Sequence, residues 1–152
     1  MSQPAHERVL YVAEPAAAWA VRPPAVVDCS VLSALLWAEP AAAEARSRVA
    51  GYSLHAPSLL RYELANVGRN KARSGVPPDE ARAGVEAFTE LTVVLRDVEP
   101  MRLFDIAQRL SLTAYDAAYL CLAAELGAPL ITFDRQLAQA AARLLGGSGT
   151  PP

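Results

Sequence analysis

Ala25-Val26-Val27-Asp28 is the stretch that decides the fold of this 152-residue chain. Its run of small and β-branched apolar residues predicts a short buried strand, and Asp28 ends it. Residues 30–38 follow at once with helical character. A buried strand that feeds directly into a helix is typical of a parallel sheet, in which strands are joined by crossover helices.

The same alternation continues along the chain. We expect further strands at 52–56, 92–95 and 130–133. We expect helices at 41–50, 57–73, 100–110, 114–126 and 135–145, with another beginning at 77–80. This order predicts an α/β sandwich, with a parallel sheet covered on both faces by helices.

The chain divides into three parts. Residues 1–24 contain four of the twelve prolines and read as an N-terminal extension, with an edge strand at 9–12. Residues 25–145 form one domain, long enough to bury a core. Residues 146–152 read as a flexible tail.

Composition limits the classes of function. Apolar residues make up 53% of the chain and the mean hydropathy is +0.17, an excess that predicts a covered interface with a second subunit or a partner. No apolar run approaches the ~18 residues of a membrane span, and the N-terminus does not have the form of a signal peptide, so we expect a cytoplasmic protein. The net charge of −2 argues against a protein that coats nucleic acid nonspecifically.

Cysteine and histidine are too few for a metal cage. Cys29 and Cys121 lie inside apolar segments, and only His6 and His55 are available beside them. Any metal is therefore expected to be a hard cation held by carboxylates.

Four acids converge on one edge of the predicted sheet. Asp28 ends the first strand, Asp134 follows the last strand, Asp116 lies in the first turn of helix 114–126, and Glu63 lies in the second turn of helix 57–73. The carboxyl ends of parallel strands share an edge, which is where sites in such folds lie. Ser30 and Thr132 stand beside two of the acids and could position a water or a phosphate.

Each acid also has a purely structural interpretation. Asp28 and Asp134 could cap the helices that follow them, and Thr113 stands three residues before Asp116, the spacing of a capping box. Glu63 fits this interpretation least, because no basic residue lies three or four positions away and it borders an apolar stripe. Clustered carboxylates repel one another unless a cation intervenes, and Mg²⁺ or Mn²⁺ would orient water for attack on a phosphodiester.

Four segments carrying these acids resemble the acidic motifs of PIN domains, and more narrowly those of VapC toxins. The segments are Val26-Val27-Asp28-Cys29-Ser30, Arg61-Tyr62-Glu63-Leu64-Ala65-Asn66, Leu112-Thr113-Ala114-Tyr115-Asp116-Ala117-Ala118-Tyr119 and Ile131-Thr132-Phe133-Asp134-Arg135. The resemblance spans residues 25–145, with the motifs in the family's order. It implies a PIN-like three-layer sandwich with a central, mostly parallel sheet flanked by helices.

The resemblance also implies an activity and partners. It implies a Mg²⁺- or Mn²⁺-dependent endoribonuclease, a toxin that cleaves transfer or ribosomal RNA and inhibits translation. It implies a homodimer neutralised by a VapB-like antitoxin. Asp28, Glu63, Asp116 and Asp134 would hold the metal and activate water, and Thr132 would support them. The chain departs from the family in its long extension at 1–24 and in its Gly- and Pro-rich end, where the family often has a last strand.

Basic and aromatic residues near the acids stay open. Arg61, Arg69, Lys71 and Arg73 give helix 57–73 a basic character. For the last three we favour an ordinary solvated helix end, whereas Arg135 is favoured as a phosphate contact. Tyr62, Tyr115 and Tyr119 could stack on bases or belong to the core, and Trp37 could be core or a contact with a dimer partner or antitoxin.

Three other functions remain as alternatives. A catalytically silent PIN-like module would bind RNA or protein, but would not need all four acids. A phosphatase or phospho-receiver is disfavoured because Cys29-Ser30, and no second Asp, follows Asp28, and because Lys71 lies at a helix end. A nuclease that processes RNA without acting as a toxin would have the same site.

Overall fold

The computed structural model describes residues 21–145 of the chain. The predicted edge strand at 9–12 and the predicted tail at 146–152 lie outside the described residues. The strands are β1 (Pro24–Val27), β2 (Ser53–Pro57), β3 (Val93–Arg96) and β4 (Leu130–Ile131). The helices are α1 (Cys29–Leu36), α2 (Ala42–Val49), α3 (Leu60–Arg73), α4 (Pro78–Thr89), α5 (Pro100–Leu110), α6 (Ala114–Leu126) and α7 (Arg135–Leu145).

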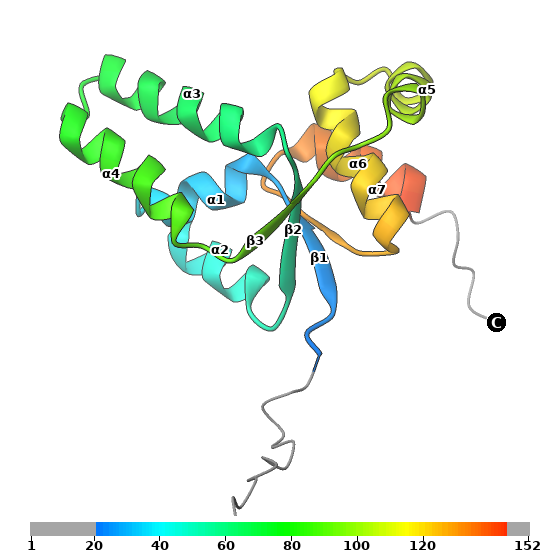
Figure 1. Ribbon diagram of the computed structural model, residues 1–152, viewed down its shortest axis with the longest axis horizontal. Coiled ribbons are helices and arrows are strands. Elements are labelled where there is room, and N and C mark those ends of the chain that lie inside the picture. Colours follow the sequence, from blue (N-terminus) through cyan, green and yellow to red (C-terminus); the bar gives the residue numbers. More distant parts are fainter. Residues whose placement is uncertain (1–20, 146–152) are drawn as a thin grey trace, which may run out of the picture.

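All four strands of the sheet are parallel, in the order β3-β2-β1-β4. The central strand β1 pairs with β2 on one side and with β4 on the other, so that Val26 lies beside both His55 and Leu130. Helices α1 to α4 gather on one side of the sheet and α5 to α7 on the other (Figure 1). The predicted α/β sandwich is therefore confirmed.

Helix α6 forms the centre of one helical layer. Every residue from Ala117 to Ala123 is buried, which is the pattern of a helix enclosed on all sides. It contacts β1, β2 and β4 as well as α5 and α7. Because this helix is held on every side, the side chains in its first turns are fixed relative to the sheet.

Helix α3 begins later than predicted. We expected Pro57 to open this helix, but Pro57 is the last residue of β2, and the Ser58 N–H donates to the Arg96 carbonyl at 2.8 Å. Proline fixes its own backbone and drives the residue before it into an extended conformation, which favours continuation of the strand. Glu63 therefore lies in the first turn of α3, not the second.

Strand β4 is shorter than predicted. It ends at Ile131, whose carbonyl accepts from the Asp28 N–H at 3.2 Å, and does not reach Phe133. The Thr132 hydroxyl is instead bonded to Asp28. Residues 132–134 thus form a loop at the carboxyl edge of the sheet.

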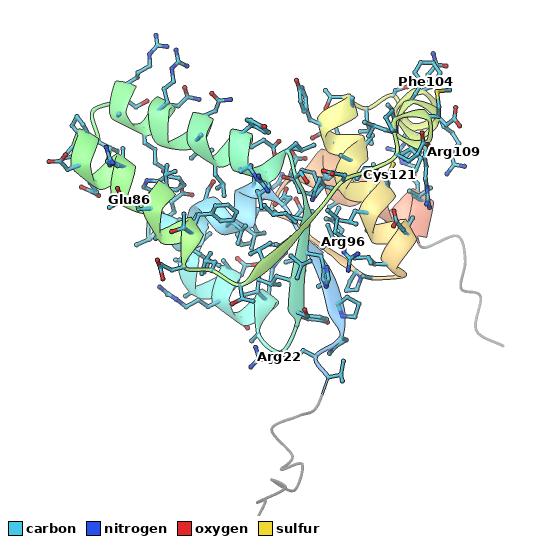
Figure 2. The ribbon with its side chains drawn as sticks, viewed as in Figure 1. Arg22, Glu86, Arg96, Phe104, Arg109 and Cys121 are labelled. Atoms are coloured by element: carbon cyan, nitrogen blue, oxygen red, sulfur yellow. The ribbon has the colours of Figure 1, made fainter. Side chains whose placement is uncertain are left out.

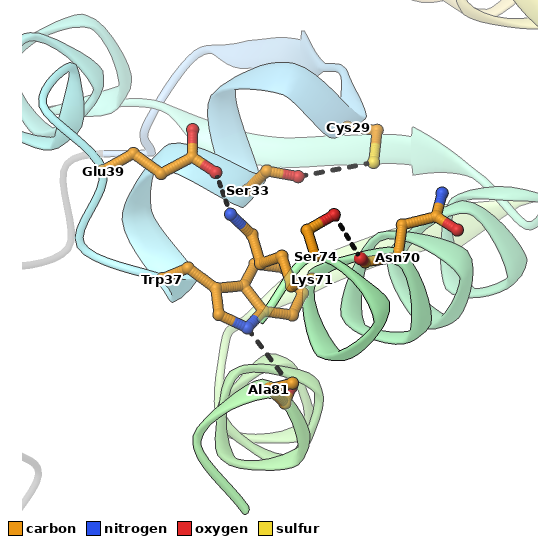
Figure 3. Close-up of polar contacts among 8 residues, drawn as sticks. All are labelled: Cys29, Ser33, Trp37, Glu39, Asn70, Lys71, Ser74 and Ala81. Carbon is orange, nitrogen blue, oxygen red and sulfur yellow. Dashed lines mark hydrogen bonds and ion pairs between the residues drawn. The ribbon is translucent and has the colours of Figure 1, made fainter. Parts of the chain in front are cut away.

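Trp37 follows α1 and contacts both α3 and α4, through Lys71 and Ala81 (Figure 3). Its indole N–H donates to the Ala81 carbonyl at 3.2 Å. A Cβ added to Gly84 would overlap the indole ring, and one added to Gly68 would lie 2.6 Å from a methyl carbon of Val85. The two glycines therefore leave the space that the indole and the close helix contact occupy.

Lys71 completes this cluster. Its ammonium group lies 2.6 Å from the Glu39 carboxylate and 5.4 Å from the centre of the Trp37 ring. Trp37 and Lys71 are both half-buried. The interpretation of Lys71 as part of an ordinary solvated helix end is wrong, and Trp37 packs within the chain.

Within residues 21–145, no helix combines the length and apolar character needed to cross a bilayer.

Candidate active site

The four predicted acids lie at the carboxyl edge of the sheet, at the ends of strands or the starts of helices. Asp28 directly follows β1, and Asp134 ends the loop after β4. Glu63 and Asp116 lie in the first turns of α3 and α6.

Asp28 is the most constrained of the four, with only 5% of its surface exposed. One carboxylate oxygen accepts from the Ser30 N–H at 3.0 Å, the Ser30 hydroxyl at 2.7 Å and the Val31 N–H at 3.2 Å. The other oxygen accepts from the Thr132 hydroxyl at 2.6 Å. Burial raises the pKa of Asp28, and these hydrogen bonds oppose the rise.

Ser30 and Thr132 link Asp28 to the loop after β4. The Ser30 hydroxyl, which donates to Asp28, accepts from the Phe133 N–H at 3.0 Å. The Thr132 hydroxyl, which also donates to Asp28, accepts from the Asp134 N–H at 2.9 Å. Each hydroxyl thus uses its proton on the carboxylate and is held by a backbone N–H, so both position Asp28 and the loop.

Asp134 and Asp116 both serve the ends of helices. An Asp134 carboxylate oxygen accepts from the Leu137 N–H at 2.9 Å, which caps α7. The Asp116 N–H donates to the Thr113 hydroxyl at 3.1 Å, and that hydroxyl donates back to the Asp116 carboxylate at 2.8 Å. The capping interpretation therefore describes part of what Asp28, Asp116 and Asp134 do, and it leaves one or more carboxylate oxygens for a second role.

Glu63 caps nothing and is instead bound by a tyrosine from another helix. The Tyr119 hydroxyl donates to its Oε2 atom. Glu63 is half-buried, whereas Tyr119 is 2% exposed and belongs to the core. The sequence placed Tyr119 near the acids without assigning it this contact, although its position one turn after Asp116 puts both on one face of α6.

Three of the acids lie close enough for their charges to interact. Burial raises the pKa of Glu63, and the negative charges of Asp28 and Asp116 raise it further, while the bond from Tyr119 lowers it. Asp134 is connected to the same group through Thr132. The structure therefore brings Asp28, Glu63 and Asp116 together, with Asp134 at the margin.

The donor set fits a hard cation. Within residues 21–145, no three His, Cys, Asp or Glu side chains are arranged so that they could hold an ion as they stand. Mg²⁺, however, is ordinarily held by one or two carboxylates together with waters and substrate phosphates. A group of separated carboxylates, in which Asp28 and Asp116 raise the pKa of Glu63, matches that mode of binding.

Arg48 is a supporting residue that sequence reasoning missed. From α2 it donates to the Thr132 carbonyl at 3.2 Å, and its guanidinium lies 4.9 Å from the centre of the Phe133 ring. It thereby braces the loop that carries Thr132 and Asp134. No spacing in the sequence could have indicated this contact, because 84 residues separate Arg48 from Thr132.

Two other residues near the acids, Arg135 and Cys29, differ in their exposure to solvent. Arg135 is exposed at the start of α7, next to Asp134. Burial raises the pKa of the Cys29 thiol to about 12, so this thiol stays protonated at neutral pH. A protonated thiol is a poor nucleophile, so the carboxylates are the candidates for the chemistry of this site.

Known proteins with the same organisation confirm the family. A family model described as PIN domain matches residues 25–143. Ribonuclease VapC3 of Pyrobaculum aerophilum is 35% identical over 125 residues, covering 75% of this chain and 92% of that protein. Ribonuclease VapC12 of Mycobacterium tuberculosis is 33% identical over 115 residues, covering 75% of this chain and 89% of that protein.

A solved structure agrees in fold. The crystal structure of PAE2754 from Pyrobaculum aerophilum superposes with a TM-score of 0.63 at 26% identity, covering 82% of this chain and 88% of that one. This chain belongs to the PIN-domain family and is VapC-like within it.

Proposed function

We propose that this protein is a divalent-metal-dependent endoribonuclease and the toxin of a type II toxin–antitoxin pair. The observation that carries the proposal is the grouping of Asp28, Glu63 and Asp116 at the carboxyl edge of a parallel sheet. There the charges of Asp28 and Asp116 raise the pKa of Glu63. The relatives named ribonucleases support an RNA substrate.

Each residue of the group has a distinct task in this proposal. Asp28, Glu63 and Asp116 would hold Mg²⁺ or Mn²⁺, and Asp134 would complete the set from the loop after β4. The bound ion supplies charge stabilisation of the phosphodiester and a more acidic water. Ser30 and Thr132 keep the Asp28 oxygens aimed at the site, and Tyr119 orients Glu63. The exposed Arg135 would meet a phosphate of the RNA.

The test is cleavage of a pool of transfer and ribosomal RNA by purified protein with Mn²⁺ or Mg²⁺. Discrete fragments are expected, and they should vanish with chelator and with Asp28→Asn. The matched control is Asp105→Asn, an exposed aspartate on α5, which should cut like the parent. Folded protein that leaves every RNA intact at all metal concentrations would favour a silent binding module.

The partners follow from the same proposal. We expect a VapB-like antitoxin, a homodimer and a cytoplasmic site of action, where transfer and ribosomal RNA are found. Expression of the chain alone should arrest growth and translation, and co-expression of a neighbouring antitoxin reading frame should restore both. Light scattering of the purified chain tests the dimer. A cleaving enzyme that never arrests growth would indicate RNA processing instead of toxicity.

A further inference from the structure

A cleft of about 430 Å³ opens beside Glu63. We call it the tyrosine cleft, and it is lined by Leu59, Tyr62, Glu63, Asn66 and Tyr115. The N-cap residue Leu59 is followed at helical spacing by Tyr62, Glu63 and Asn66 on one face of α3, and Tyr115 comes from the first turn of α6. Its volume falls within the range of about 300–1,000 Å³ that is typical of small-ligand sites.

The two tyrosines of the cleft, Tyr62 and Tyr115, differ from the nearby Tyr119 in their exposure to solvent. Tyr119 is buried and bonded to Glu63, whereas Tyr62 is 70% exposed and Tyr115 is 65% exposed. Large aromatic side chains left in water at a concave site are informative, because folding gains nothing from keeping them there. Their π-faces suit a flat, aromatic occupant.

The polar residues of the cleft narrow the class of occupant. The exposed Asn66 offers an amide donor and an amide acceptor, the pair that reads the edge of a base. The Glu63 carboxylate disfavours an anionic group in the cleft. The cleft also shares Glu63 with the acidic group, so an occupant sits directly beside the bond proposed to be cut.

We propose that the tyrosine cleft is a subsite for one unpaired nucleobase of the RNA substrate, which stacks on Tyr62 and Tyr115 beside the phosphodiester that faces the acids. This inference rests on the proposed function and adds the part of the RNA that is recognised. Because a base inside a duplex cannot offer its face, the cleft selects single-stranded or looped RNA.

Binding tests this without requiring cleavage. The parent is Asp28→Asn protein, and the probe is a short fluorescein-labelled single-stranded RNA of mixed sequence, followed by anisotropy. Tyr62→Ala and Tyr115→Ala should each weaken binding by about 5- to 150-fold, the range that loss of one base–aromatic stack gives. Tyr62→Phe and Tyr115→Phe keep the ring and should bind within about threefold of the parent.

Controls separate stacking from other effects. Phe104 on α5 is also an exposed aromatic, at 55%, and lies outside the cleft (Figure 2), so Phe104→Ala should leave RNA binding unchanged. The same RNA annealed to its complement should bind more weakly and should not respond to the tyrosine substitutions. Since Tyr62 and Tyr115 are mostly exposed, all variants should melt like the parent, which thermal denaturation checks.

The outcomes distinguish this inference from the proposed function. If wild-type protein cuts RNA while Tyr62→Ala and Tyr115→Ala bind as tightly as the parent, the subsite is wrong and the nuclease stands. If wild-type protein cuts nothing but the tyrosine variants lose RNA binding, the subsite stands and the nuclease is wrong. Unchanged RNA binding together with lost capture of a co-expressed antitoxin would make the cleft a protein-docking site and overturn the proposal.

Discussion

Glu63 depends on Tyr119 for its position, because that hydroxyl is its one hydrogen-bond donor among the described residues. We expect Tyr119→Phe to fold normally and to lose about tenfold in kcat/KM, the effect of removing a bond to a charged group worth about 1.5–3 kcal/mol and partly replaced by water. Mn²⁺ binding followed by calorimetry should weaken in parallel.

The pH profile distinguishes positioning from simple damage to the fold. The bond from Tyr119 lowers the pKa of Glu63, so its loss should raise that pKa and move the acid limb of the rate profile to higher pH. Tyr52→Phe, which alters a half-buried tyrosine away from the acids, is the control and should leave the limb in place. An unmoved limb in Tyr119→Phe would contradict the assigned role.

At this scale the sequence predicted the acids better than their surroundings. Asp28, Glu63 and Asp116 could be placed at one edge because strands and helix starts alone determine where they lie. Tyr119 and Arg48 could not be assigned, because their contacts with Glu63 and Thr132 depend on how helices far apart in the chain pack together. Capping does not exclude the proposed metal binding, since one carboxylate has two oxygens and several lone pairs.

At the scale of elements, α2 braces the loop between β4 and α7 through Arg48. Arg48→Ala should change the free energy of unfolding by less than about 1 kcal/mol, because the side chain is 46% exposed. RNA cleavage should nevertheless fall severalfold, since the loop carrying Asp134 loses its brace. Arg46→Ala, at an exposed position on the same helix, should lower neither stability nor cleavage. Equal losses in both Arg variants would point to a general effect of charge.

The packing of α4 against α1 depends on Gly84. Alanine normally stabilises a helix relative to glycine by about 0.5–1 kcal/mol, but here its Cβ would overlap the Trp37 indole. Gly84→Ala should therefore destabilise the protein by about 1–3 kcal/mol in urea denaturation. In a Trp37→Ala background the space is empty, so the same change should be neutral or stabilising. A Gly84→Ala protein as stable as the parent would show that the indole can move aside.

The elements themselves were largely predictable from the sequence. The periodicity of apolar residues, together with Gly and Pro at element ends, predicted every strand and helix of residues 25–145. The differences lie at the ends of elements and arise from particular residues. Pro57 extends β2 and delays α3, and Thr132 leaves the ladder because its hydroxyl bonds to Asp28. The role of Trp37 remained open, because a sequence does not show whether an indole packs against its own chain or against another.

For the whole molecule, the acidic group makes the metal-free protein sensitive to pH. Burial raises the pKa of Asp28 and Glu63 in the folded state, whereas the unfolded chain leaves both at ordinary values. The folded state then binds protons more tightly, so this contribution to stability is present below the ordinary carboxyl pKa and is lost as pH rises through the raised values. The acidic group thus destabilises the metal-free fold at neutral pH.

Glu63→Gln isolates this contribution, because its amide oxygen can still accept from Tyr119. In chelator, the variant should melt like the parent at low pH and at a higher temperature near neutral pH, with each kcal/mol worth about 2–4 °C. Saturating Mn²⁺ should stabilise the parent and remove its disadvantage. Glu125→Gln, an exposed change on α6, should show no such pH-dependent gain. A constant difference at every pH would mean that packing, not charge, distinguishes the variant.

The strand order β3-β2-β1-β4 also has a consequence for synthesis. The ribosome makes Asp28, Glu63 and Asp116 first, but β4 and the Thr132 that holds Asp28 come last. A growing chain therefore carries three of its acids while β4, one of the two strands that pair with β1, is still missing. The acids are held in place only when nearly the whole domain has been made, so we expect the proposed nuclease activity to arise only after Thr132 has been added.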